Sequence, residues 1–68
     1  MVLVFKTNIF HQLEIHVRDL LSTFRNISRI DFDFEDRDKV LRVETSKDIS
    51  SEIVFLLNSK GFYCKELE

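Results

Sequence analysis

Apolar residues recur along this chain with two different periods, and the order of those periods constrains the fold more than any other feature. A repeat of two residues is typical of half-buried strands, whereas a repeat of about 3.6 residues is typical of amphipathic helices. The pattern predicts strands over residues 2–6, 29–35, 40–44 and 62–67, and helices over residues 9–25 and 50–60. The predicted order is therefore strand, helix, strand, strand, helix, strand.

Both predicted helices have recognisable ends and one apolar stripe. Thr7 and Asn8 are expected to cap the first helix, since their side-chain oxygens can accept hydrogen bonds from free backbone N–H groups. Ser50 is expected to cap the second helix, and Gly61 follows its last turn, where a left-handed residue is common. The buried stripes are expected to consist of Leu13, Val17, Leu20, Leu21 and Phe24 in the first helix, and of Ile53, Val54 and Leu57 in the second.

The two central strands specify their own register. One alignment pairs apolar residues with each other on the inner face and opposite charges with each other on the outer face. Such charge pairs stabilise a sheet by roughly 0.2–1 kcal/mol each, and a slip by one residue would place charges in the core. The predicted pairs are Phe32–Leu41, Ile30–Val43, Asp31–Arg42 and Arg29–Glu44.

These elements predict one α+β domain over residues 1–68, a ferredoxin-like βαββαβ sandwich. Right-handed crossovers and antiparallel pairing of the central strands give a four-stranded antiparallel sheet in the order 4-1-3-2, with both helices on one face. The single cysteine, Cys64, cannot form an intramolecular disulfide, so packing must stabilise the domain.

Several groups of residues follow the spacing of one known domain: the stripe Val17, Leu20, Leu21, Phe24 and Ile27, the strands 30–33 and 39–43, the helix start 49–53 and the pair Gly61-Phe62. Through them the chain resembles, over almost its whole length, the heavy-metal-associated domain, the small copper- and zinc-handling module of metallochaperones and metal-transporting ATPases. The resemblance implies a ferredoxin-like fold. In that family a Met-x-Cys-x-x-Cys loop between the first strand and the first helix binds a soft metal through two thiolates.

The family's metal-binding residues are absent from this chain. The resemblance places the family's Met on Asn8 and its two cysteines on Phe10 and Leu13. Phe and Leu have no donor atoms, so we interpret the chain as a degenerate member without the Cys-x-x-Cys site, and we expect no cofactor. Phe10 and Leu13 are expected to extend the core stripe over the former metal position.

Three other side chains carry nitrogen or sulfur ligands: His11, His16 and Cys64. His11 and His16 lie roughly 140° apart around a helix, so they do not share a face. Zinc sites use three or four convergent ligands. Metal binding through His11 or another non-thiolate group is therefore the alternative hypothesis, and exposed histidines with a buried structural Cys64 are the preferred interpretation.

Charge and motifs argue against several function classes. Ten basic and twelve acidic residues give a net charge of −2, without the basic patch that nucleic-acid binding requires. The sequence has no basic amphipathic stretch that would bind a membrane surface. It also has no nucleophile–base pair and no phosphate-binding loop, the features that would indicate an enzyme. The apolar run 1–5 is too short for a signal-peptide core, and a lone Cys suits a reducing compartment, so we expect a cytoplasmic protein.

Three apolar residues lie off the buried stripes: Ile15 on the first helix, and Phe55 and Leu56 on the second. Both helices cover one sheet face, so their outer surfaces point the same way. Isolated apolar residues are common on protein surfaces, whereas a cluster marks a contact site. The sequence thus predicts a small non-enzymatic domain that acts through contact with an unknown protein partner or through self-association, and not through nucleic acid, membrane or metal.

Overall fold

The order of elements in the computed structural model, which describes residues 1–67, is the predicted one. A short 3₁₀ turn, η1, precedes the first helix. The strands are β1 (Val2–Thr7), β2 (Ile27–Asp33), β3 (Val40–Thr45) and β4 (Cys64–Glu66), and the helical segments are η1 (His11–Leu13), α1 (Glu14–Leu21) and α2 (Ser50–Ser59).

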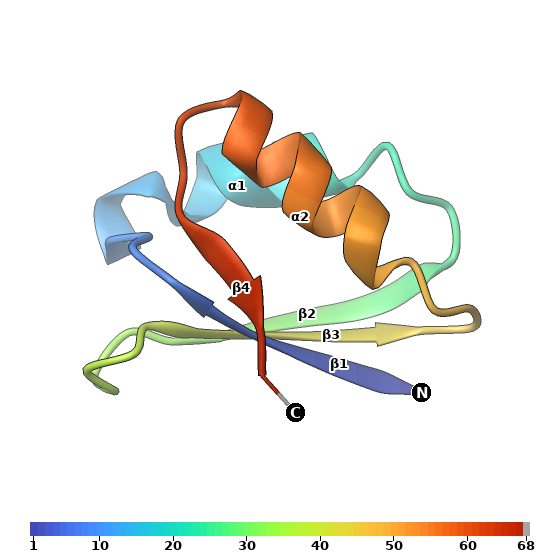
Figure 1. Cartoon of the computed structure of the whole chain (residues 1–68), viewed down its shortest axis with the longest axis horizontal. Coiled ribbons are helices and arrows are strands. Elements are labelled where there is room, and N and C mark those ends of the chain that lie inside the picture. Colours follow the sequence, from blue (N-terminus) through green and yellow to red (C-terminus); the bar gives the residue numbers. More distant parts are fainter. Residues whose placement is uncertain (68) are drawn as a thin grey trace.

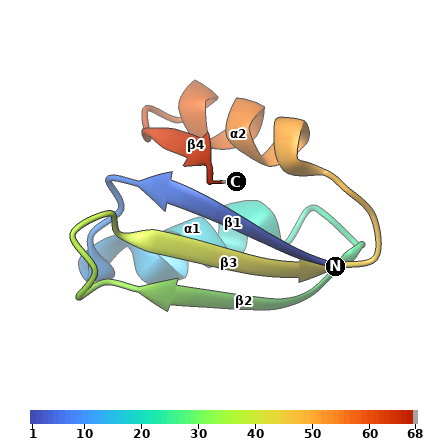
Figure 2. The same cartoon turned by 60° about the horizontal axis from the view of Figure 1, so that its bottom comes forward.

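The four strands form one antiparallel sheet in the order β2-β3-β1-β4, which is the predicted order read from the other edge. Figure 1 shows α1 and α2 side by side on the same face of this sheet. In Figure 2, β2 and β4 form the two outer strands, and the opposite face has no helix over it. The ferredoxin-like α+β fold is therefore confirmed.

The predicted register of the central hairpin is also confirmed. All four predicted pairs are present between β2 and β3, and they end at Asp33 opposite Val40. β2 covers residues 27–33, whereas the predicted strand covers residues 29–35. A β-bulge between Ile27 and Arg29 adds residues at the start of the strand, and a turn after Asp33 ends the strand two residues early. In that turn the Asp36 N–H donates to Asp33 Oδ1 at 3.3 Å.

The core lies between the sheet and the two helices. Its largest members are fully buried, which removes their apolar surface from water and supplies the main stabilising free energy. They come from both layers and from the loop before η1: Phe5, Leu41 and Val43 of the sheet, Val17 and Leu21 of α1, Ile53 and Leu57 of α2, and Ile9 of the loop.

The first helix is much shorter than the predicted range 9–25. α1 begins at Glu14, and neither Thr7 nor Asn8 caps it. It ends at Leu21, because the Ser22 hydroxyl donates to the carbonyl of Asp19 at 2.5 Å and so competes with helix continuation. Phe24 still packs against the core, but from the connection after the helix.

The second helix begins at Ser50, the residue predicted to be its N-cap. Asp48 provides the side-chain hydrogen bonds at this end of the helix. Its Oδ1 accepts hydrogen bonds from the Ser50 N–H at 3.1 Å and from the Ser50 hydroxyl at 2.7 Å. Ser50 is therefore the first helical residue and not the cap. These bonds, the hydroxyl first, hold the pKa of Asp48 below its usual value.

The C-terminal end of α2 agrees with the prediction. Gly61 has a φ of +90°, and the Phe62 N–H donates back to the carbonyl of Leu57 at 3.0 Å, as in a Schellman motif. The last strand is shorter than the predicted range 62–67, because Phe62 packs against the core before β4 begins at Cys64.

Candidate functional site

The loop between β1 and α1 is the segment on which the sequence resemblance places a metal-binding loop. Thr7 anchors its first residues. The Thr7 hydroxyl donates to the carbonyl of Lys39 at 2.6 Å and accepts the Ile9 N–H at 3.1 Å, and Thr7 is 5% exposed. Ile9 is fully buried. The loop is thus fixed by a buried hydroxyl and one core side chain.

Asn8, on which the sequence resemblance places the family's Met, links the loop to a distant part of the chain. Its Oδ1 accepts a hydrogen bond of 2.9 Å from the Tyr63 N–H, just before β4. The amide therefore satisfies a backbone donor beside the short edge strand. The sequence did not indicate this role, because the two residues are 55 positions apart.

Phe10 and Leu13 do not extend the core, so that prediction is wrong. Phe10 is 57% exposed and Leu13 is 38% exposed, because Ile9 fills the buried position of this loop. The Lys39 ammonium lies 5.1 Å from the centroid of the Phe10 ring, at cation–π distance. The Leu13 N–H donates to the Phe10 carbonyl at 2.9 Å, so the two residues lie within one turn.

His11 and His16 each pack near a different phenylalanine ring. The ring of His11 meets Phe34 edge-on with centroids 6.2 Å apart, and the ring of His16 lies 6.3 Å from Phe62. Within residues 1–67, no group of three or more His, Cys, Asp or Glu side chains is placed to hold a metal ion.

Cys64, the remaining soft ligand, lies on β4 opposite Thr7 and is 4% exposed. Burial raises the pKa of its thiol from 9.0 to about 12. The thiol is therefore protonated at neutral pH, whereas a metal-binding or nucleophilic cysteine is a thiolate. Its position agrees with the interpretation of Cys64 as a buried structural residue.

The outer surface of the helices carries large exposed apolar side chains. Ile15 on α1 is 84% exposed and Phe55 on α2 is 76% exposed. Phe55 and the half-buried Leu56 line one hollow of about 530 Å³ together with Phe24. Ile15 is not among the residues that line it. The sequence placed Phe24 in the buried stripe of the first helix. In the structure Phe24 follows the end of α1, and it both packs against the core and lines this hollow.

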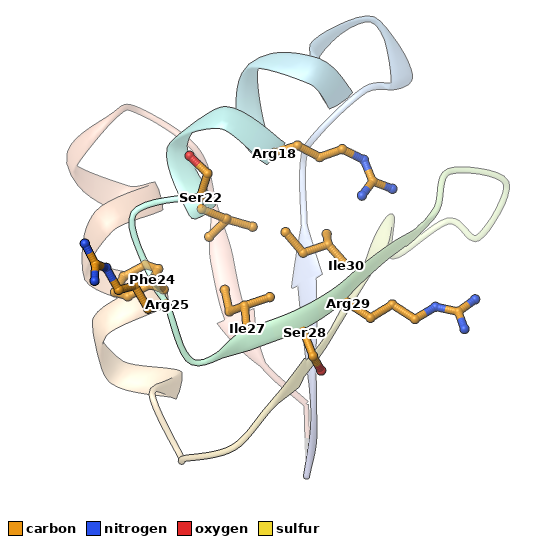
Figure 3. Close-up of a pocket in the computed structure, with 9 residues that line it drawn as sticks. Arg18, Ser22, Phe24, Arg25, Ile27, Ser28, Arg29 and Ile30 are labelled. Atoms are coloured by element: carbon orange, nitrogen blue, oxygen red, sulfur yellow. The ribbon is translucent and has the colours of Figure 1, made fainter.

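A second hollow of about 520 Å³ lies between α1 and the edge strand β2. Leu21, Ile27 and Ile30 contribute apolar side chains to it, and Figure 3 shows the guanidinium groups of Arg25 and Arg29 pointing away from each other at its two ends. These two cations do not converge, and the third arginine that lines the hollow, Arg18, pairs with Glu14 at 2.8 Å, so the three guanidinium groups form no common anion site.

Comparison with known proteins adds one finding. No protein-family model matches the chain, and no curated protein matches it. A solved structure, the N-terminal domain of ZntA in the Zn(II) form, aligns with a TM-score of 0.82 over 98% of this chain and 92% of that domain. The two chains share one fold. Their sequence identity is 13%, so the similarity to the ZntA domain concerns the fold and not the family or the activity.

Among the described residues, no helix has the length and apolar character needed to cross a membrane. The longest helix is α2, with ten residues.

Replacing the Thr7 hydroxyl should destabilise the domain. The variant Thr7→Val keeps the shape but leaves the Ile9 N–H and the Lys39 carbonyl without their partner, so the free energy of unfolding should fall by about 1–3 kcal/mol. Thr7→Ser keeps the hydroxyl and should lose less. Urea unfolding followed by circular dichroism measures both; equal stability of Thr7→Val and the wild type would show that the hydroxyl is no anchor.

The buried thiol predicts a specific pH dependence. The unfolded chain releases the Cys64 proton near its ordinary pKa of 9.0, whereas the folded chain holds it to about pH 12. The free energy of unfolding should therefore fall as the pH rises from about 9 towards 12, and this contribution should be fully present below pH 9. Cys64→Ala should lack it. Urea titrations of both proteins at several pH values test this, and parallel pH curves would contradict it.

Proposed function

We propose that this chain is a non-enzymatic interaction domain that contacts another protein, or a second copy of itself, through the outer surface of its two helices. The observation that carries the proposal is the 76% exposure of Phe55 beside a hollow. Ile15 and Leu56 are the other proposed contacts. Phe55 contributes little to the core, so burial against a partner is the contact in which its apolar surface leaves water.

The chemistry of this surface supports the proposal. A hollow lined by Phe24 and Leu56 accepts an apolar side chain from a partner, while Phe55 itself projects outwards. Aromatic residues next to such hollows frequently supply most of the binding free energy of an interface. Ser51 and Glu52 border the same hollow and would form its polar rim.

The alternative is a metal-binding or metal-trafficking protein that uses non-thiolate ligands such as His11. The resemblance to the heavy-metal-associated domain and the fold shared with the ZntA domain favour it. The described residues favour it less, because Phe10 and Leu13 have no donor atoms and burial keeps Cys64 protonated. We therefore place protein contact first, in the reducing environment of the cytoplasm, and propose no cofactor.

Replacing Phe55 by Glu should weaken partner binding without unfolding the domain. A photoreactive side chain at position 55 should cross-link to one protein, which mass spectrometry identifies, whereas the same group at Val2 on the helix-free face should not. With the purified partner, Phe55→Glu should raise the dissociation constant by about thirtyfold, as expected for an aromatic hot spot.

The matched control is Val2→Glu, because Val2 is also exposed (56%) and apolar but lies on β1. This variant should bind like the wild type. Light scattering of wild type and Phe55→Glu shows whether the cross-linked partner is a second copy. Equal affinities of Phe55→Glu and Val2→Glu would refute the helical surface as the contact.

The metal alternative predicts a different result. Titrated with zinc(II) or copper(I) against a competing chelator, the wild type should show no binding at micromolar metal. The variant F10C/L13C should bind, because it places two thiols within one turn at the positions that the resemblance gives to the family's cysteines. Binding by the wild type that His11→Ala abolishes would establish the metal alternative.

A further inference from the structure

β2 is a long strand with a free side. It has seven residues and, within residues 1–67, pairs only with β3, whereas the opposite edge strand, β4, has three residues. Figure 2 shows β2 at the outside of the sheet, with α1 on the far side of the sheet. In an antiparallel sheet, alternate residues of an edge strand direct their N–H and C=O groups away from the neighbouring strand. Such an edge can pair with a further strand.

Two opposite charges lie close together on this edge. Arg29 and Asp31 are two residues apart on the outer face, with side chains 66% and 46% exposed. The Arg29 Nε lies 2.8 Å from Asp31 Oδ2, and 3.9 Å from a carboxylate oxygen of Glu44 on β3. A guanidinium has five N–H donors, so Arg29 keeps donors for a further carboxylate.

We infer that β2 pairs with β2 of a second copy of this chain, antiparallel and centred on Ile30, to form a two-fold symmetric dimer with a continuous eight-stranded sheet. In this register Arg29 of each copy lies directly opposite Asp31 of the other. The symmetry produces the ion pair twice. Both pairs lie on the helix-free face, where oppositely charged cross-strand neighbours stabilise pairing.

The charges select this register over its neighbours. A two-fold pairing that keeps the helices of both copies on one face must centre on a residue. Centring on Arg29 places Arg29 against its own copy, and centring on Asp31 does the same for Asp31. Centring on Phe32 places Asp31 against Asp33. Of the pairings centred on Arg29, Ile30, Asp31 and Phe32, only the one centred on Ile30 places no two like charges opposite each other.

The helix-side residues of β2 agree with the same register. Ile30 meets Ile30 of the second copy on the two-fold axis. Ile27, Ile30 and Phe32 are only half-buried in one copy, so apolar surface remains to be covered. The hollow between α1 and β2 lies beside the proposed interface.

Two features limit the assembly to a dimer: the β-bulge in β2 and the shortness of β4. The register shift between Ile27 and Arg29 interrupts regular pairing beyond Arg29, so the ladder is short and cannot slide far. Once β2 is paired, the free edges of the dimer are the three-residue β4 strands. An interface that uses the same strand of both copies produces a dimer and not a filament.

This dimer goes beyond the proposed function, because it uses the sheet edge and leaves Ile15 and Phe55 free for another contact. The two surfaces lie on different elements, so separate variants can test them.

Charge reversal tests the dimer and its register together. R29D places a carboxylate opposite Asp31, and D31R places a guanidinium opposite Arg29, so each variant alone should raise the dimer dissociation constant about tenfold at low salt. In an equimolar mixture of R29D and D31R, a heterodimer sets the introduced carboxylate against the introduced guanidinium and keeps the native Asp31 opposite the native Arg29. Sedimentation equilibrium should show that the mixture regains wild-type affinity as this heterodimer.

Both variants also remove the Arg29–Asp31 ion pair within one copy, so circular dichroism must confirm that each is folded. A measurement on the wild type needs no variant: amide hydrogen exchange of alternate β2 residues should slow as protein concentration rises. A wild type that stays monomeric to about 1 mM would overturn the inference. A dimer that Phe55→Glu dissociates and the charge mixture does not restore would also overturn it, and would support the helical surface instead.

Discussion

The register between β2 and β3 is the constraint on which the rest of the structure depends. Because side chains alternate between the two faces of a strand, a shift of one residue would move Ile30 and Phe32 out of the core and Asp31 into it. With the register fixed, the inner face of the sheet is apolar from β2 to β1. The two helices then have one surface to cover, and their buried stripes meet it.

The sequence predicts those parts of the structure that depend on neighbouring residues or on repeated spacing. The strands, the hairpin pairs and the Gly61 end of α2 follow from such local patterns. The start of α1 does not, because Thr7 and Asn8 are typical helix caps whose oxygens bind instead to Lys39 and Tyr63, 32 and 55 residues away. A local pattern carries no information about such distant partners.

The candidate site shows the same division. The exposure of Ile15 and Phe55 could be inferred from their angular position on a helix, since it depends only on the buried stripe of the same helix. The outward position of Phe10 could not, because it depends on Ile9 filling the core and on Lys39 lying over the ring. The hollow beside Phe55 was equally hidden, because Phe24 reaches it only from the connection after α1.

The hydrogen bond between Asn8 and Tyr63 has a consequence for how this chain can change over evolution. If the loop once held a metal, regaining the full Met-x-Cys-x-x-Cys sequence would require replacing Asn8, and that step removes the acceptor of a backbone N–H beside β4. Cysteines at positions 10 and 13 would leave this hydrogen bond intact, whereas a Met at position 8 would leave the exposed Tyr63 N–H to water. Position 8 is therefore tied to the edge of the sheet by its side chain, whereas the side chains at positions 10 and 13 are exposed.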